Sequence, residues 1–349
     1  MRELHIQNHI INDASECFVI AEVGHNHQGS LETCKKMFKE AANSGAHAVK
    51  LQKRNNKQLF TKSFYAKPYD NENSYGATYG EHREFLEFNK DQYLDLQKYA
   101  EALELVFFAT PFDTDSVDFL EEIKVPCYKL ASGDLRTIPL IEKIAKTGKP
   151  ILISTGASYL DEVKIAYETV LRHHNQICIL QCTSGYPIEA HEAHLNVLDT
   201  YRKECPQAVL GYSGHDNGIL LPVIAYLKGA RVIEKHFTLN RAWKGTDHKF
   251  SLEPVGMRKM VRDLKRVREC LGNPEKVCLQ GEEAGRVKMG KSIYTARDLE
   301  AGTVLSNDLI TLKSPGGGLT PDKLPSVLGR TLKRNMKEEE FITLQDLND

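Results

Sequence analysis

The sequence predicts an α/β chain in which eight parallel strands, each followed by a helix, close into a barrel, with a small second domain at the C-terminal end. Three observations support this prediction. Short apolar runs recur along the first three quarters of the 349 residues, segments with helical periodicity lie between them, and the pattern changes after about residue 272. Alternating strands and helices form parallel βαβ units, and eight such units in about 250 residues are typical of a TIM barrel.

The expected strands are rich in β-branched residues and occur at regular intervals. In chain order they cover residues 17–24, 46–53, 105–112, 127–132, 150–156, 178–184, 208–215 and 232–237. The first helix is expected to begin after Ser30, a capping residue, and to end at Gly45. Further helices are expected within 114–124, 158–174, 217–230 and 254–272. An open doubly wound sheet is the alternative, but the first strand is followed by GHNHQGS instead of the glycine pattern GxGxxG.

One connection, between the second and third strands, is much longer than the others. About 50 residues intervene, and only the last part, DQYLDLQKYAEALE, has the pattern of a helix. Because βα loops lie at the active-site end of a barrel, the rest is a candidate substrate lid. It carries cationic and aromatic side chains that could bind a ligand, although a solvated loop explains them equally well: Lys57, Lys62, Lys67, Tyr75, Tyr79, His82 and Arg83.

The chain is expected to contain two domains and a linker. Residues 1–272 form the barrel, 273–287 form the linker, and 288–349 form the second domain. Frequent Gly and Pro in the last segment predict short strands and turns.

Composition excludes several classes of protein. The 46 Lys and Arg residues against 47 Asp and Glu leave a net charge of −1, which argues against nucleic-acid and polybasic membrane binding. No apolar run reaches the roughly 18 residues of a membrane span. The N-terminus lacks a secretory pattern, and the eight cysteines form no CxxC pair. A cytoplasmic protein with free thiols is therefore expected.

Polar residues gather on one parity of the expected strands, although both faces of a parallel barrel strand should be apolar. They crowd toward the C-terminal strand ends, where barrel active sites lie, so a purely structural network is the weaker interpretation. Gln181 and Lys235 lie on the other, apolar parity and remain unexplained. The polar set comprises Glu22, Lys50, Gln52, Thr110, Lys129, Ser154, Cys182, Ser184, Ser213, His215, Glu234 and His236.

Two kinds of chemistry are indicated by this set. His215 and His236 end the last two strands, which are neighbours in a closed barrel, and an imidazole pair suits Mn²⁺, Fe²⁺, Co²⁺ or Zn²⁺. Glu22 or Glu234 could complete such a metal site. Lys50 and Lys129 are expected near the hydroxyl groups of Ser132, Ser154 and Ser213. Two ammonium groups with several hydroxyls predict a site for phosphate or carboxylate. A Schiff base on Lys129 is the rival chemistry, and the histidine pair favours the metal.

Motifs along nearly the whole chain occur in the same order as in one known family and resemble those of that family. IAEVGHNHQGS, VKLQK, FFATPFD, YKLASGD, ILISTGA, LQCTSGYP, GYSGHD, IEKHFT and WKGTDHKFSLEP together are similar to the sialic acid synthase family. GKSIYTARDLEAGTVLSNDLITLKSPGGGL resembles the antifreeze-like (SAF) domain of that family, and YGEH, CTSGYP and WKGTDH resemble its animal type.

The resemblance implies a metal-dependent transferase. Phosphoenolpyruvate would condense with N-acetylmannosamine, or its 6-phosphate, to give N-acetylneuraminate, or its 9-phosphate, and inorganic phosphate. The implied cofactor is Mn²⁺, with Mg²⁺ or Co²⁺ as alternatives. A homodimer is also implied, in which the SAF domain caps the active site of the partner. A related synthase for legionaminate, pseudaminate or deaminated neuraminate, and a non-catalytic sugar-binding protein, are kept as alternatives.

The resemblance also implies roles for particular residues. His215 and His236 match the metal ligands, and Glu22 matches an acidic residue that handles a proton. The catalytic set is Glu22, Lys129 and Asp134, where Asp134 stands in place of a Glu found in some members. Ser314 departs from an Arg that contacts the N-acetyl group in bacterial free-sugar members. The family's sugar-contacting positions correspond to Gln52, Tyr186 and Asp247. Its phosphoenolpyruvate-contacting positions correspond to Lys50, Thr110, Lys129, Ser132, Ser154, Ser184 and Ser213.

Overall fold

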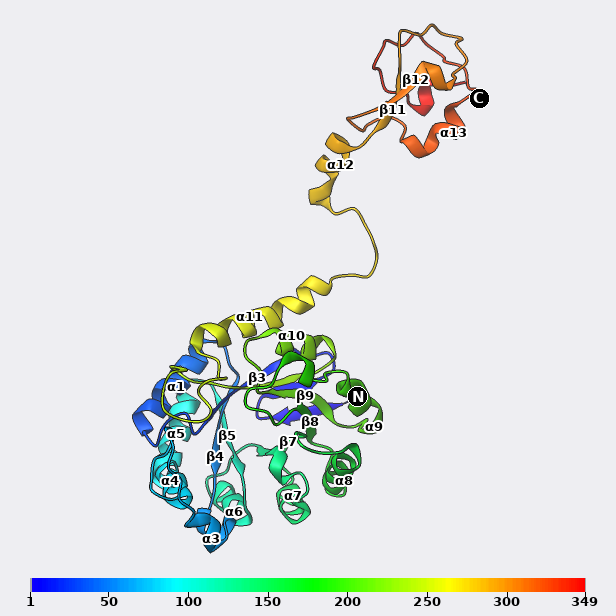
Figure 1. Cartoon of the computed structure of the whole chain (residues 1–349). Coiled ribbons are helices and arrows are strands. Elements are labelled where there is room, and N and C mark those ends of the chain that lie inside the picture. The colour runs from blue at the N-terminus through cyan, green and yellow to red at the C-terminus, as the bar shows by residue number, and fades with distance from the viewer. Residues whose placement is uncertain (1, 349) are drawn as a thin grey trace. The chain divides into compact units, whose positions relative to one another are not determined.

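The computed structural model describes residues 2–348 and divides into two compact units, Met1–Gly272 and Asn273–Asp349 (Figure 1). The first unit confirms the predicted TIM barrel. Its eight parallel strands pair in chain order, and the last strand closes on the first. The strands are β3 (Phe18–Gly24), β4 (Ala48–Lys53), β5 (Val106–Pro111), β6 (Tyr128–Leu130), β7 (Ile151–Ser154), β8 (Ile177–Cys182), β9 (Val209–Gly214) and β10 (Val232–His236).

Helices surround the barrel, as the alternating pattern predicts. The first begins after Ser30, whose side chain accepts a hydrogen bond from the Thr33 backbone N–H, and the chain turns at Gly45 with φ +83°. The helices α7 and α9, of 8 residues each, were not predicted from the sequence pattern. The outer helices are α1 (Leu31–Asn43), α5 (Lys90–Ala102), α6 (Thr114–Glu122), α7 (Ile138–Ala145), α8 (Leu160–Leu171), α9 (Val197–Glu204), α10 (Leu220–Leu227) and α11 (Pro254–Leu271).

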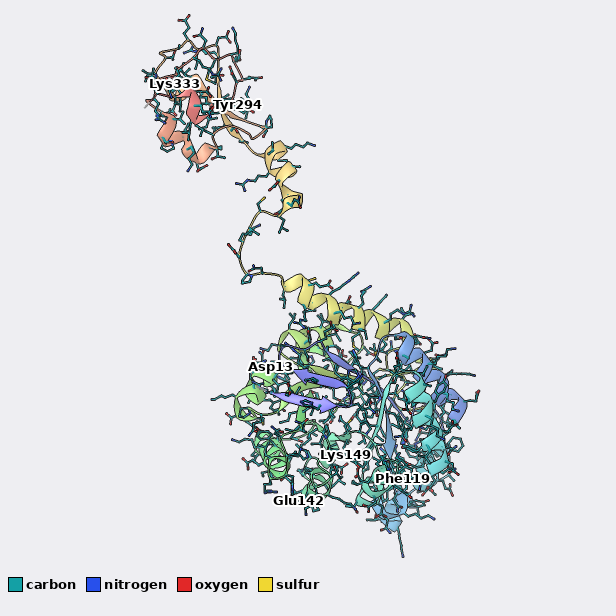
Figure 2. The ribbon with its side chains drawn as sticks, turned by 180° about the vertical axis from the view of Figure 1, so that it is seen from behind. Asp13, Phe119, Glu142, Lys149, Tyr294 and Lys333 are labelled. Carbon is teal, nitrogen blue, oxygen red and sulfur yellow. The ribbon has the colours of Figure 1, made fainter. Side chains whose placement is uncertain are left out.

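The apolar parity of the strands packs against these helices and forms the main core. Phe107 of β5 lies with its ring centroid 5.7 Å from that of Phe38 on α1. Between neighbouring helices, Phe119 of α6 packs against Tyr93 of α5 with ring centroids 5.1 Å apart. Phe119 is labelled in Figure 2, which views the molecule from the side opposite to Figure 1. Because this parity is buried under helices, the opposite parity faces the interior of the barrel.

A hairpin that the sequence analysis did not predict precedes the barrel. It pairs β1 (Glu3–Ile6) with β2 (His9–Asn12) in antiparallel register. His9 lies against Phe18, the first residue of β3, with ring centroids 5.0 Å apart. The hairpin therefore lies at the amino ends of the strands, away from the expected active-site end.

The long connection after β4 folds into three short helices before α5. They are α2 (Asn56–Leu59), α3 (Lys62–Tyr65) and α4 (Tyr79–Phe85). The Tyr75 hydroxyl donates to the Lys244 carbonyl at 2.7 Å, and Asn73 accepts from the Gly245 backbone N–H at 2.9 Å. The insertion is thus held against the loop that follows β10, at the carboxyl ends of the strands.

The second unit confirms the predicted small domain of short strands and turns. It contains the antiparallel pair β11 (Ser292–Thr295) and β12 (Ile310–Lys313), with α12 (Glu283–Met289) and α13 (Leu324–Val327). A separate apolar cluster fills this unit, including Ile293, Leu305, Val327, Leu332 and Ile342. Across residues 2–348, no helix combines the length and the apolar character that crossing a membrane requires.

Candidate active site

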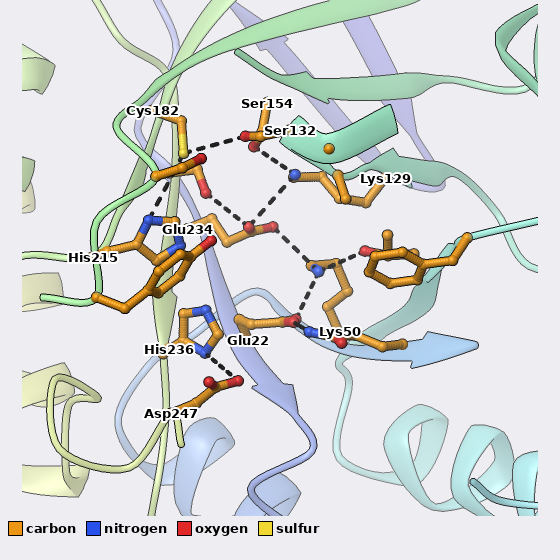
Figure 3. A pocket seen from close by; sticks show the side chains of 18 of the residues that line it. Glu22, Lys50, Lys129, Ser132, Ser154, Cys182, His215, Glu234, His236 and Asp247 are labelled. Carbon is orange, nitrogen blue, oxygen red and sulfur yellow. Dashed lines mark hydrogen bonds and ion pairs between the residues drawn. The ribbon is translucent and has the colours of Figure 1, made fainter. Parts of the chain in front are cut away.

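A cavity of about 430 Å³ lies at the carboxyl ends of the barrel strands, a volume suited to small-molecule substrates (Figure 3). Every residue assigned to the site from the sequence lines this cavity, with the exception of Asp134. Those residues are Glu22, Lys50, Gln52, Thr110, Lys129, Ser132, Ser154, Ser184, Tyr186, Ser213, His215, His236 and Asp247.

Two lysines and two carboxylates form an ion-pair network inside the barrel (Figure 3). Lys50 Nζ lies 2.7 Å from Glu22 Oε2 and 3.8 Å from Glu234 Oε2. Lys129 Nζ lies 3.8 Å from Glu234 Oε1 and donates to the Ser154 hydroxyl at 2.5 Å. All four charged side chains are buried. Burial of charge is costly unless partners compensate it, and here each ammonium faces a carboxylate.

The two carboxylates differ in their protonation. Burial raises the pKa of Glu22 to about 7; Lys50 opposes the rise and the charge of Glu234 adds to it. For Glu234, burial is outweighed by Lys129, Lys50 and His236, so its pKa is lowered. Near neutral pH, Glu22 exchanges a proton while Glu234 stays ionised. Carboxyls whose pKa values are pushed apart in this way are typical of acid–base sites.

The imidazoles of His215 and His236 face each other with ring centroids 5.4 Å apart. His215 Nδ1 donates to the Thr183 carbonyl at 3.0 Å, which leaves Nε2 free as an acceptor or a ligand. His236 Nδ1 is buried without a hydrogen-bond partner, 3.8 Å from Asp247 Oδ2. An orphaned imidazole nitrogen beside a second imidazole fits a divalent metal. Among residues 2–348 no three or more His, Cys, Asp or Glu side chains converge on one point.

Asp134 lies outside the cavity, in the turn after β6, although its neighbour Gly133 is part of the lining. Burial raises the pKa of Asp134 to about 6, and the Thr137 hydroxyl donates to the carboxylate at 3.3 Å. The structure therefore does not bring this residue together with the rest of the predicted site.

Several cavity residues were not assigned to the site from the sequence. Glu234 was identified by parity and as a carboxylate that could complete the metal site, and Arg83 only as a loop cation, whereas Arg54, Phe112 and Thr246 were missed. A signal for Arg54 existed, because it continues the alternation of Lys50 and Gln52 along β4. Arg54 donates to Gln52 Oε1 at 2.7 Å, and its guanidinium stacks on the Phe112 ring at 3.6 Å from the centroid.

Comparisons with known proteins agree with this geometry. The NeuB family model matches residues 37–276, and the SAF domain model matches residues 290–348. The chain is 40% identical over 334 residues to the human N-acetylneuraminate-9-phosphate synthase, covering 95% of this chain and 93% of that protein. It is 34% identical over 326 residues to the N,N'-diacetyllegionaminic acid synthase of Legionella pneumophila, covering 92% and 91%.

A solved structure is also similar over most of the chain. The N-acetylneuraminic acid synthetase of Leptospira borgpetersenii, determined in complex with citrate, superposes with a TM-score of 0.71 at 30% identity, covering 81% of this chain and 95% of that one. The family match spans more than half of the sequence and agrees with the barrel, the polar cavity and the small C-terminal domain. The chain therefore belongs to the NeuB family and carries a C-terminal SAF domain.

Proposed function

We propose that this protein condenses phosphoenolpyruvate with N-acetylmannosamine, free or as its 6-phosphate. The products are N-acetylneuraminate, or its 9-phosphate, and inorganic phosphate. One observation carries the proposal: a single cavity holds two buried lysines with several hydroxyls on one side and an imidazole pair on the other. Similarity to the human and Legionella synthases supports the same assignment.

Phosphoenolpyruvate is assigned to the lysine side of the cavity. Its phosphate and carboxylate would replace part of the internal ion-pair network and accept hydrogen bonds from Lys50 and Lys129. Hydroxyl groups already accept from these ammonium groups, with Thr110 at 2.8 Å from Lys50 Nζ and Ser154 at 2.5 Å from Lys129 Nζ. The lysines would position the enol and stabilise the negative charge of the departing phosphate.

The sugar aldehyde is assigned to the imidazole side. His215 and His236 would hold a divalent metal such as Mn²⁺, which when bound supplies Lewis-acid polarisation of the aldehyde. Asp247 lies beside His236, Gln52 also lines the cavity, and their carboxylate and amide groups can hydrogen-bond sugar hydroxyls. This arrangement would bring the aldehyde carbon next to the enol.

The reaction then needs one carbon–carbon bond and one proton relay. Carbon 3 of phosphoenolpyruvate attacks the aldehyde carbon, and Glu22 gives its proton to the oxygen that becomes a hydroxyl. Water captures the cation at carbon 2 and returns a proton to Glu22. The new hydroxyl at carbon 2 passes its proton to the departing phosphate as the C–O bond breaks, and a ketone remains. A pKa of about 7 suits Glu22 to this exchange.

A Schiff base on Lys129 is the second candidate, because burial lowers the pKa of that ammonium. Its Nζ donates to the Leu130 carbonyl at 3.0 Å as well as to Ser154. Borohydride trapping of a substrate adduct that survives chelation would establish this chemistry instead of the metal-dependent condensation.

The product mass tests the proposal directly. Purified protein is incubated with phosphoenolpyruvate, Mn²⁺ and an equimolar mixture of N-acetylmannosamine and its 6-phosphate, with a chelated sample as control. The mass of N-acetylneuraminate or of its 9-phosphate is expected, and only in the sample that contains metal. A metal-loaded protein that forms neither product would contradict the proposal and direct the search to other nonulosonate precursors.

A further inference from the structure

A buried phenylalanine ring packs against both imidazoles of the candidate metal site. Phe250 lies in the loop between β10 and α11, is 1% exposed, and is not among the described residues that line the cavity. Its ring centroid is 5.0 Å from that of His236 at an interplanar angle of 73°, and 5.8 Å from that of His215 at 86°. Because the two imidazole centroids are 5.4 Å apart, the three rings form one compact triangle of edge-to-face and tilted contacts.

The two imidazoles are held in different ways. His215 Nδ1 donates to the Thr183 carbonyl at 3.0 Å, and the Tyr186 ring lies 4.3 Å from the His215 ring between centroids. Within residues 2–348 the His236 ring makes no hydrogen bond, and its Nδ1 is buried 3.8 Å from Asp247 Oδ2. A metal-binding histidine usually owes its orientation to a hydrogen bond at its second nitrogen. The orientation of the His236 ring therefore depends on packing.

The backbone around Phe250 is bonded to the strand that carries His236. The Leu252 N–H donates to the His236 carbonyl at 2.7 Å, two residues after Phe250. Ser251, the next residue after Phe250, accepts from Asn26 Nδ2 at 2.9 Å, and Asn26 itself follows β3. These bonds fix the Phe250 backbone relative to β10, so the phenyl ring is a rigid support for the imidazoles.

The surroundings of Phe250 distinguish it from an ordinary core residue. Among residues 2–348, its aromatic neighbours are the two imidazoles and Tyr186, whose ring centroid is 5.5 Å away, and all three line the cavity. Phe250 is not part of the main apolar core between the barrel and its helices. A fully buried phenyl ring beside two imidazoles is therefore placed to serve the site and not only to fill the core.

We infer that Phe250 is a positioning residue for the divalent metal: it holds the His236 imidazole in the orientation from which both histidines bind one ion. This inference rests on the proposed function, in which the histidine pair binds the metal. A ring that is already oriented loses less conformational freedom when it binds a ligand, and this increases affinity. Groups that orient metal-binding side chains typically contribute 10- to 100-fold to metal affinity.

The test measures Mn²⁺ affinity without substrates, on full-length, metal-free protein, from the EPR signal of the Mn²⁺ that stays free. In Phe250→Leu the Kd for Mn²⁺ should rise about 10- to 100-fold. Phe250→Tyr keeps an aromatic ring and should retain most of the affinity. Phe38→Leu is the matched control, because it removes a buried ring that packs against Phe107 under α1, and it should keep the wild-type Kd.

Steady-state kinetics give a second readout. Because Phe250 acts through the metal, the activity that Phe250→Leu loses at limiting Mn²⁺ should return at saturating Mn²⁺. The KM for phosphoenolpyruvate should then equal the wild-type value, since the proposed contacts of that substrate are the two lysines. A kcat that stays low at saturating Mn²⁺, with an unchanged Kd for Mn²⁺, would overturn the inference.

Two further outcomes separate the inference from the proposed function. Equal Kd values for wild type and Phe250→Leu, or equal losses in Phe250→Leu and Phe38→Leu, would overturn the role of Phe250 while leaving the condensation standing. Full Mn²⁺ affinity in His236→Ala would refute the metal site of the proposed function and the inference with it. Thermal melting checks that each variant is folded, and Phe250→Met, which fills more of the volume without a ring, replaces the Leu variant if that one does not fold.

Discussion

At the scale of single residues, the two carboxylates inside the barrel show how position alone sets chemical behaviour. Strand parity predicted that both side chains point into the barrel, and both line the cavity. Glu22 has one ammonium at 2.7 Å, whereas Glu234 has two, each at 3.8 Å, together with the Ser213 hydroxyl at 3.0 Å. No sequence pattern encodes these distances. The opposite pKa shifts of the two groups could therefore be found only from the folded structure.

Replacing Glu22 by Gln tests its role as the proton donor. Gln keeps the shape and polarity but carries no exchangeable acid, so kcat should fall by about 10²- to 10⁴-fold. Because burial raises the pKa of Glu22 to about 7, the acid form is lost as pH rises through that value, and wild-type kcat should decline over the same range. The measurement is kcat against pH for both proteins. Persistence of the same alkaline decline in Glu22→Gln would assign the titration to another group.

Much of the site could be predicted from residue parity, and the exceptions have physical reasons. The rule of alternate residues holds only while the chain is extended, and it identified the inward side chains up to the strand ends. Asp134 was assigned from the family resemblance and not from parity; it lies beyond β6 in a helical turn, where alternation does not apply, and it is not among the residues that line the cavity. Arg54 follows the alternation one residue past β4 but lies outside the apolar run that marked the strand.

At the scale of elements, a buried ion pair joins the ends of β9 and β10. Lys235 Nζ lies 2.8 Å from Asp216 Oδ1 and donates to the Asp216 carbonyl at 2.5 Å. This contact explains why a lysine interrupts the apolar parity of β10. Each partner is adjacent in sequence to one of the facing histidines, so the pair fixes the two strand ends that carry the imidazoles. Gln181 is explained similarly, because it donates to the Ala193 carbonyl at 3.1 Å and accepts from the Tyr201 hydroxyl at 3.3 Å.

Lys235→Met should destabilise the barrel strongly. Lys235 is fully buried, and its removal would leave the Asp216 carboxylate, among the side chains of residues 2–348, with the Tyr212 hydroxyl at 2.9 Å as its remaining partner. Breaking a buried ion pair in this way costs about 3–5 kcal/mol of unfolding free energy. The double variant Asp216→Asn/Lys235→Met removes both charges and should recover part of that loss. Urea denaturation measures both, and equal stabilities for the single and double variants would show that the ion pair is not the cause.

Short elements account for most of what the sequence did not reveal about the fold. The eight strands and the long helices have clear periodicity. The missed helices α7 and α9 have 8 residues each and complete little more than two turns, although α10, of the same length, was predicted. The helices of the insertion are shorter still, 4 to 7 residues. Their formation depends on tertiary contacts such as the bond from Tyr75 to the Lys244 carbonyl. Local patterns cannot report a contact between segments 169 residues apart.

At the scale of the whole molecule, the family resemblance leaves one prediction to be tested: a homodimer in which the C-terminal domain of one subunit caps the active site of its partner. Light scattering after size-exclusion chromatography should give twice the 39.4 kDa mass of the chain. A mass of one chain would contradict the dimer.

Mixing two inactive proteins tests the capping itself. A chain truncated after Gly272 retains its own cavity but lacks the C-terminal domain, and full-length His236→Ala retains that domain but lacks an imidazole that we propose binds the metal. If the domain acts across the dimer, each protein alone should be inactive, and subunit exchange should restore condensation, because the domain of the His236→Ala subunit then caps the intact cavity of the truncated one. The control is His236→Ala taken through the same exchange procedure without the truncated chain. Mixtures that exchange subunits but stay inactive would show that each domain serves its own barrel.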